Sequence, residues 1–227
     1  MHNAILNICS LFNQYCPLCD SPLKDGGGPC AECLGDLPYH HQGCDICALP
    51  GVTGTCENCA KQRPSFSRVF AGFTYRFPLP QIIHRVKKGA DPEALHWLAQ
   101  TLTKRLGAQL PTDAALIAVP MHPIDELIRG FNQSRVLAES IAQQLNRPAP
   151  LSVLQKSRRT EHQAHLNRAQ RRANLAHCFE IEREPPKRLI LVDDVMTTGT
   201  TVERISDLLL KSGAEEVFIC TLCRTPD

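Results

Sequence analysis

Two adjacent carboxylates and a hydroxyl-rich loop occur together in residues 189–201, and their side chains are the best suited to chemistry in this chain. Asp193 and Asp194 follow four apolar residues, which predicts a buried strand that ends at the acid pair. The residues after the loop have helical spacing, so we place the loop at a helix N-terminus. Free backbone N–H groups and the helix dipole favour an anion there. The loop residues are Thr197, Thr198, Gly199, Thr200 and Thr201.

The acid pair limits which anionic ligands can bind beside the loop. Carboxylates repel a bare phosphate, so they fit better as acceptors for sugar hydroxyls or as ligands of a magnesium ion. A ribose 5-phosphate satisfies both halves, with its hydroxyls on Asp193 and Asp194 and its phosphate on the loop. The alternative is a strand that ends in a solvated acid pair and a threonine-rich turn, with no ligand.

Residues 189–201 resemble the phosphoribosyl-pyrophosphate (PRPP) motif of type I phosphoribosyltransferases, which they match without gaps. In that family the acids bind the ribose hydroxyls and the loop binds the 5-phosphate. The resemblance implies an α/β fold, in which helices flank a parallel sheet, and it implies PRPP with Mg²⁺ as the ligand.

The N-terminal part is rich in cysteine. Of 12 cysteines, eight form four C-x-x-C pairs before residue 60. Each pair can close a tight turn around one ion, and four thiolates complete a tetrahedral structural zinc site that has no catalytic role. We predict two zinc ions with sequential pairing; interleaved pairing and a disulfide cluster are the alternatives. The expected ligands are Cys16, Cys19, Cys30 and Cys33 for one ion, and Cys44, Cys47, Cys56 and Cys59 for the other.

The composition is that of a globular protein, with 227 residues, 43% of them apolar and 21% charged. We predict a zinc-binding region over residues 1–64 and a phosphoribosyltransferase-like domain over residues 65–227. The first 65 residues hold 3 Lys or Arg and 6 Asp or Glu, whereas the rest holds 22 and 17, so the larger part is basic and suited to phosphates. No apolar run has the length of a membrane span and the N-terminus is a poor signal peptide, so we expect a cytoplasmic protein.

Hydrophobic periodicity predicts an alternation of strands and helices. Parallel sheets bind ligands at the carboxyl ends of their strands, so the loop after the strand over residues 114–120 should face the same crevice as the acid pair. Strands are expected over residues 69–75, 114–120, 151–154, 179–181, 189–192 and 215–224, and helices over residues 5–12, 82–88, 92–106 and 134–145 and after the threonine loop.

The whole pattern is similar to the ComF/GntX family. It combines the cysteine pairs with Val-Pro-Met-His-Pro, Arg-Gly-Phe-Asn-Gln and the acid-threonine motif, between about Cys16 and Arg224. The likeness implies a bacterial protein linked to natural competence and to the handling of single-stranded DNA. It also implies that the basic segment over residues 156–172 is a hood over the reacting sugar. By this likeness Pro120, Met121 and His122 lie near pyrophosphate, Arg158, Arg159 and Gln163 approach pyrophosphate or an acceptor, and Arg129 and Arg158 join the acids as candidate catalytic residues.

Three functions fit these features. The first is a PRPP- and Mg²⁺-binding protein that acts in DNA uptake together with single-stranded DNA and other competence proteins. The second is an active phosphoribosyltransferase of nucleotide salvage, which would displace pyrophosphate from C1 of PRPP through an oxocarbenium-like transition state. The third is a regulator that senses PRPP without turnover. The arginines at positions 168, 171 and 172 have helical spacing and form either a solvated face or a phosphate or nucleic-acid contact.

Overall fold

A computed structural model describes residues 15–23, 28–89, 91–159 and 178–226. By packing, the chain divides into two compact units, residues 1–38 and 39–227. The division falls between the two groups of cysteines, whereas the sequence predicted a boundary after residue 64. The second group of cysteines belongs to the unit that contains the sheet, because Cys47 and Cys59 share one hydrophobic core with Val217 of that sheet.

The first unit contains the short helix α2 (Ala31–Gly35). The second unit alternates strands and helices in the way that the sequence predicts. Its elements are α3 (Glu57–Lys61), β1 (Arg68–Thr74), α4 (Leu79–Lys87), α5 (Glu93–Leu106), η1 (Gly107–Gln109), β2 (Ala115–Ala118), α6 (Pro123–Arg129), α7 (Gln133–Gln144), β3 (Leu154–Lys156), β4 (Phe179–Ile181), β5 (Arg188–Met196), α9 (Thr200–Lys211) and β6 (Glu216–Arg224).

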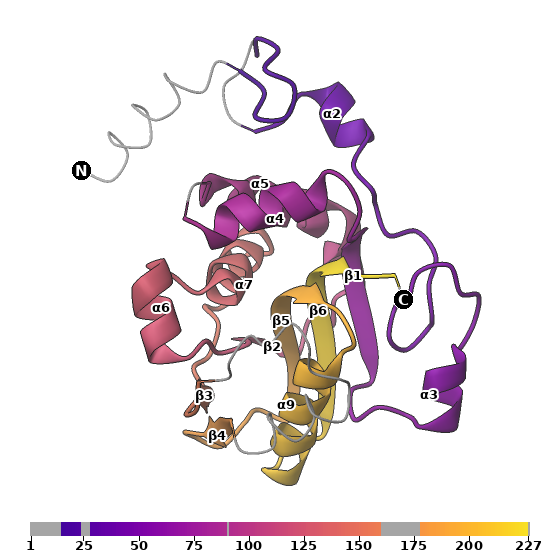
Figure 1. Cartoon of the computed structure of the whole chain (residues 1–227). Helices are drawn as coiled ribbons and strands as arrows, with labels where there is room; N and C mark the ends of the chain where they lie inside the picture. Colours follow the sequence, from indigo (N-terminus) through magenta and orange to yellow (C-terminus); the bar gives the residue numbers. More distant parts are fainter. Residues whose placement is uncertain (1–14, 24–27, 90, 160–177, 227) are drawn as a thin grey trace. The chain divides into compact units, whose positions relative to one another are not determined.

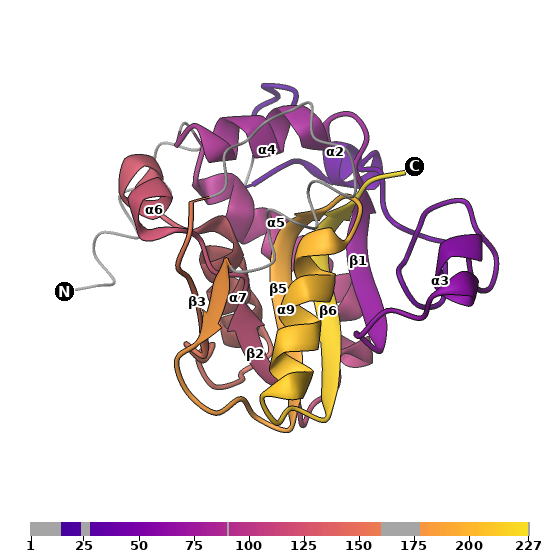
Figure 2. The same cartoon turned by 60° about the horizontal axis from the view of Figure 1, so that its bottom comes forward.

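The second unit is built on a four-stranded sheet in the order β1-β6-β5-β2, and all of its neighbouring strands are parallel. Helix α9 covers one face, and α5 and α7 cover the other, as Figures 1 and 2 show. Strands β3 and β4 form a separate antiparallel pair. This is the predicted fold class, a parallel sheet flanked by helices.

The inner strand β5 has no exposed surface over residues 189–192, because both faces of the sheet are covered. The strand does not end at the acid pair, as the sequence predicted, but continues to Met196. The reason is its neighbour β6, which pairs with it as far as Met196 and Arg224. Asp193 therefore lies within the paired strand, opposite Thr221.

Two further differences from the predicted elements are local, and one predicted helix is not tested. Leu151 forms only an isolated bridge to Ile117, and the third strand begins at Leu154, where it pairs with Ile181. Helix α6 was not predicted, because its seven residues are too few to show a period. The helix predicted over residues 5–12 lies outside the described residues. Within the described ranges, no helix is both long enough and apolar enough to cross a lipid bilayer.

Candidate functional site

A cleft of about 760 Å³ opens at the carboxyl ends of β2 and β5, and we call it the strand-end cleft. It is the crevice expected for a parallel sheet, where loops after neighbouring strands converge. Five cationic side chains and three acids line it, so its charge favours an anionic ligand. The charged residues are Lys87, Lys88, Arg129, Lys156 and Arg159 on the basic side, and Asp125, Asp193 and Asp194 on the acidic side.

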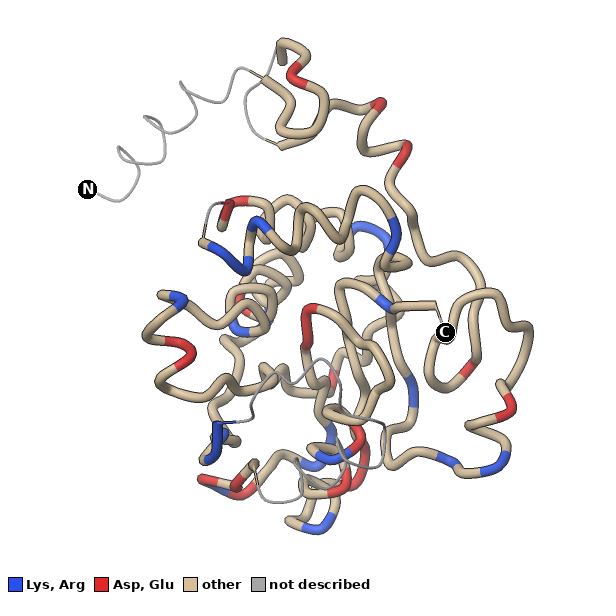
Figure 3. The backbone as a smooth tube through the Cα atoms, in the orientation of Figure 1, with Lys and Arg blue, Asp and Glu red and all other residues tan. Residues whose placement is uncertain are grey.

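The basic residues come from elements that are far apart in the sequence. Figure 3 shows blue segments on α4, on α6 and beside β3, with the acidic end of β5 between them. Arg159 is already paired with Asp125, at 2.7 Å between Nε and Oδ1. The tertiary fold, rather than any local motif, therefore brings the positive charge to the cleft.

The acid pair is held by the strand and by α7. Asp193 Oδ1 accepts hydrogen bonds from Ser134 Oγ at 3.1 Å and from the backbone N–H of Asp194 at 2.9 Å. Asp194 Oδ1 accepts from the backbone N–H of Val195 at 2.8 Å. One oxygen of each carboxylate is thus fixed by the protein, which orients the second oxygen of Asp193 for a ligand.

Lys87, the last residue of α4, balances part of the acidic charge. Its Nζ lies 2.9 Å from Asp194 Oδ2 as an ion pair, outside good hydrogen-bonding geometry. Burial lowers the pKa of Lys87, but the interactions with Asp194 and with the charge of Asp193 together outweigh it, and the net pKa is raised. Burial, and then the charge of Asp194, raise the pKa of Asp193 to about 7. Two carboxylates at one strand end are costly, as expected for a binding site.

The threonine loop, residues 197–201, connects the end of β5 to α9. Gly199 adopts the left-handed conformation, with φ of 75°, and caps the helix. Thr198 and Thr200 share a hydrogen bond of 2.8 Å between their hydroxyl groups. Within the described part of the chain, the backbone N–H groups of Thr197, Thr198 and Gly199 have no hydrogen-bond acceptor. The loop therefore presents unpaired donors at a helix N-terminus.

Asn132 connects the N-terminus of α7 to Val119, which follows β2. Its Nδ2 donates to Val119 O at 3.1 Å, while its Oδ1 caps α7 by accepting from the backbone N–H of Ser134 at 3.0 Å. The cap brings Ser134 to the acid pair. Gln133 is also buried here, and its Oε1 accepts from Arg129 Nη1 at 2.8 Å.

The structure brings part of the predicted site together. Seven predicted residues line the strand-end cleft: Pro120, Met121, Arg129, Arg159, Asp193, Asp194 and Thr201. Thr198, Gly199 and Thr200 line a second cleft on the other side of the loop. Three predicted residues line neither cleft. Thr197 and Arg158 are exposed, and His122 caps α6 by accepting from the backbone N–H of Ile124 at 3.2 Å. Gln163 and the arginines at 168, 171 and 172 lie outside the described residues.

Sequence reasoning missed several residues of the cleft. The main ones are Lys87, Lys156 and Ser134, which no motif marks, since each reaches the site through packing of its element. The signal that could have found Lys87 is weak: a short charged helix, with no partner that the sequence identifies.

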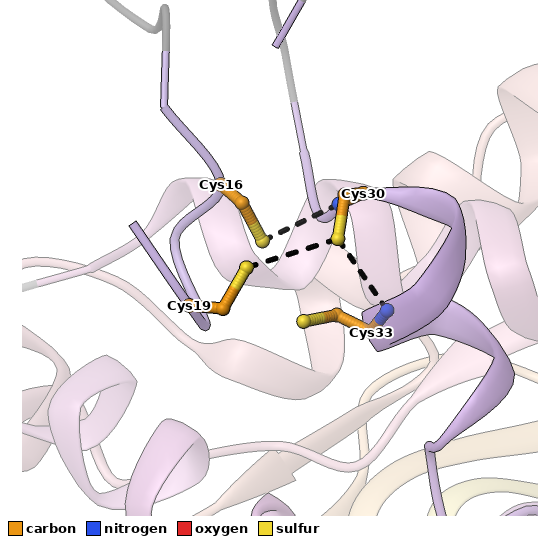
Figure 4. A group of neighbouring side chains, drawn as sticks. All are labelled: Cys16, Cys19, Cys30 and Cys33. Carbon is orange, nitrogen blue, oxygen red and sulfur yellow. Dashed lines mark hydrogen bonds between the residues drawn. The ribbon is translucent and has the colours of Figure 1, made fainter. Parts of the chain in front are cut away.

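The eight N-terminal cysteines form two groups, paired in the sequential order that we predicted: Cys16, Cys19, Cys30 and Cys33, and Cys44, Cys47, Cys56 and Cys59. In each group the four sulfurs lie within 4.8 Å of one another, the arrangement that a tetrahedral zinc site needs. Figure 4 shows the first group, in which the sulfurs face one another.

The donor chemistry also fits a metal. In both groups a backbone N–H donates to a sulfur at 3.3 Å, from Cys30 to Cys16 and from Cys56 to Cys44. Burial raises the pKa of the Cys44 thiol, but backbone hydrogen bonds, the largest at Cys47, outweigh it and lower the pKa to about 7. A thiol that loses its proton near neutral pH is ready to ligate zinc. Each group is therefore capable of binding one structural zinc ion.

Comparison with known proteins agrees with this architecture. The model of the phosphoribosyl transferase domain matches residues 132–227, which include α7, the acid pair and the threonine loop. The chain is 33% identical to the DNA utilization protein YhgH of Escherichia coli O157:H7 over 221 residues, which cover 92% of this chain and 96% of that protein.

Two further relatives carry names from competence. Competence protein F of Haemophilus influenzae is 30% identical over 225 residues, covering 93% of this chain and 91% of that protein. Competence protein ComFC of Streptococcus pneumoniae is 27% identical over 202 residues, covering 86% and 87%. These similarities cover most of the chain, which belongs to the ComF/GntX family and has a phosphoribosyltransferase domain in its C-terminal part.

Proposed function

We propose that the strand-end cleft binds PRPP together with Mg²⁺. The observation that carries this proposal is the meeting of an oriented acid pair and five basic side chains around one volume of about 760 Å³, which Thr201 of the threonine loop also lines. A ligand that suits this combination needs hydroxyl groups, a terminal phosphate and further negative charge. PRPP has all three.

Each part of the ligand has a partner in the cleft. Asp193 and Asp194 accept hydrogen bonds from the ribose hydroxyls, and the threonine loop binds the 5-phosphate through its N–H groups. Arg129 and the loop at Pro120 and Met121 lie at the end of β2, where the pyrophosphate would sit. Lys87 keeps the acid pair from repelling the anion.

The carboxylate oxygens of the acid pair are also donors that suit Mg²⁺. Asp193 and Asp194 would hold the ion when PRPP is bound, and it would supply positive charge that offsets the charge of the pyrophosphate. The chain's own contribution is to hold the acids: the backbone N–H groups and Ser134 fix one oxygen of each carboxylate, and Lys87 pairs with the second oxygen of Asp194, which leaves the second oxygen of Asp193 for the ligand.

We further propose that the protein acts in the cytoplasm in DNA uptake, through contacts with single-stranded DNA and with other competence proteins. The names of its relatives support this role, because two are competence proteins and a third is a DNA utilization protein. The excess of Lys and Arg over residues 66–227 supports contacts with a polyanion.

Calorimetric titration of the full chain with PRPP and Mg²⁺, with and without a single-stranded oligonucleotide, tests the proposal. We expect saturable PRPP binding that requires Mg²⁺, and oligonucleotide binding that weakens steeply as salt rises. The absence of PRPP binding would overturn the proposed ligand, and oligonucleotide binding without salt dependence would overturn the proposed DNA contact.

A pyrophosphate-release assay with a panel of bases separates a binding protein from an enzyme. Turnover would mean that the bond between C1 and the pyrophosphate oxygen breaks while a bond from C1 to the base nitrogen forms. PRPP binding without pyrophosphate release would instead agree with a binding or sensing role for the same cleft.

A further inference from the structure

One buried arginine connects the second group of cysteines to the threonine loop. Arg224 is the last residue of β6 and is only 4% exposed. Its Nε donates to Cys47 O at 3.1 Å. Its Nη1 donates to Thr197 O at 2.5 Å and to Thr225 O at 2.8 Å. A single guanidinium thus contacts the backbone of a cysteine ligand and the backbone of the loop.

This arginine lacks the partner that a buried cation normally has. Among the described residues, no Asp or Glu forms an ion pair with Arg224. Burying a charge is costly unless an opposite charge compensates it. Four thiolates around one Zn²⁺ carry a net charge of −2, and Cys47 belongs to such a group. The second cysteine group, when it holds zinc, supplies the missing negative charge.

The hydrogen bonds of Arg224 also set the direction of the loop N–H groups. In a trans peptide the C=O and the following N–H point in opposite directions. Because Thr197 O is held on Arg224, the N–H of Thr198 points away from that side chain. Likewise, Met196 O accepts from the N–H of Thr225 at 3.1 Å, which turns the N–H of Thr197 the same way. Both belong to the unpaired donors described above.

A second contact runs between the same two parts of the chain. Glu203, in the first turn of α9, accepts hydrogen bonds from the backbone N–H of Ser65 at 2.9 Å and from Ser65 Oγ at 3.0 Å. Ser65 follows the second cysteine group in the sequence. Glu203, Arg224, Cys47 and Thr198 all line one cleft of about 500 Å³, so residues of the second cysteine group and of the threonine loop line the same cleft.

We propose that Arg224 is a positioning residue that makes phosphate affinity at the threonine loop depend on zinc in the second cysteine group. The inference rests on the proposed function of the loop. Loss of that zinc leaves Arg224 without its counter-charge and loosens the backbone at Cys47, which accepts its hydrogen bond. Arg224 then releases the Thr197 carbonyl, and the N–H groups of the threonine loop are no longer held in one direction. The first cysteine group belongs to the other compact unit.

Calorimetry with ribose 5-phosphate as the probe, on the full zinc-loaded chain, tests the role of Arg224. We expect Arg224→Gln to weaken binding at least tenfold with unchanged zinc content. Arg224→Lys should recover little, because an ammonium cannot serve carbonyls on two sides at once. The matched control is Arg147→Gln, since Arg147 also donates from a partly buried position to a backbone carbonyl, Leu110 O at 3.1 Å. Affinities within twofold for all three variants would overturn the proposal.

The link to zinc is tested with one cysteine from each group. Cys59→Ser and Cys33→Ser should each lose one zinc equivalent, but only Cys59→Ser should weaken ribose 5-phosphate binding. Because coupling between binding equilibria is reciprocal, saturating ribose 5-phosphate should raise the zinc affinity of the Cys33→Ser chain, which retains the second group, as measured by equilibrium competition with a chelator. This measurement needs no substitution at the coupled site, so it decides the matter even where Cys59→Ser fails to fold.

The outcomes separate the two proposals. A Cys33→Ser chain that binds ribose 5-phosphate, with a zinc affinity that the ligand does not raise, would contradict the coupling and leave the proposed ligand intact. A wild-type chain that binds neither ribose 5-phosphate nor PRPP would contradict the proposed function, and the coupling with it.

Discussion

Replacing Asp193 by Asn should stabilise the protein at neutral and alkaline pH. In the folded chain, burial and the neighbouring charge of Asp194 raise the pKa of Asp193 to about 7, from an ordinary value of 3.8. The folded state therefore holds this proton to higher pH than the unfolded state does. Stability is lost as pH rises from about 4 to about 7, and the loss stays constant above that range. An amide carries no charge, so the variant avoids this loss.

The size of the effect has a ceiling. The difference between 3.8 and 7 corresponds to about 4 kcal/mol at high pH. The real gain is smaller, because the substitution weakens the charge-assisted hydrogen bond from Ser134 and removes part of the attraction to Lys87. We expect a gain of about 1–2 kcal/mol, which for a domain of this size raises Tm by about 2–8 °C.

Thermal unfolding of the zinc-loaded chain at about pH 5 and about pH 8 measures this gain. The variant should exceed the wild type at the higher pH by clearly more than at the lower pH. Asp207→Asn is the matched control, because Asp207 lies on the surface of α9 in an ion pair with Lys211, at 2.8 Å. A variant that is less stable than the wild type at about pH 8, or a difference that is the same at both pH values, would refute the reasoning.

Three further predictions follow from the same geometry. Gly199→Ala should lower the free energy of unfolding in urea by about 1–2 kcal/mol and weaken ribose 5-phosphate binding, because Gly199 has φ of 75°. An unchanged free energy of unfolding would mean that the loop conformation is different. Metal analysis should find two zinc equivalents. Loss of Cys59 should lower Tm more than loss of Cys19, because Cys59 is 8% exposed within the sheet core whereas Cys19 is exposed. An equal decrease in Tm for the two variants would contradict this. Lys87→Met should lower both stability and PRPP affinity, measured by unfolding and calorimetry, because it leaves the charge of Asp194 unbalanced; a variant that binds PRPP as well as the wild type would exclude a role for the ion pair.

The parallel sheet was predictable because its central strands are continuous apolar runs. Residues 189–192 and 215–224 read as buried strands, and residues 189–192 and 217–224 are buried in the structure. The sequential pairing of the cysteines was also within reach, since short spacing favours it. The end of β5 was not predictable from its own residues: Asp193 and Asp194 are poor strand formers, and only pairing with β6 keeps the strand regular through them.

The acidic residues of the site were predicted from the sequence more fully than its basic residues. The acid pair and the threonine loop are adjacent in the sequence, so a motif reveals them. Lys87 and Ser134 lie about 107 and 59 residues from their carboxylate partners, and only tertiary packing joins them. Arg224 was read simply as the end of a strand, because nothing in its neighbours indicates that its side chain is buried against backbone carbonyls.

The most direct test of the account is a calorimetric titration of PRPP with Mg²⁺ into the wild type and into the double variant Asp193→Asn/Asp194→Asn, with Asp207→Asn as the control. We predict that the wild type and the control bind alike, and that the double variant loses at least about 100-fold in affinity while keeping its zinc content and its fold. A double variant that binds PRPP as tightly as the wild type would contradict the claim that the acid pair holds the sugar.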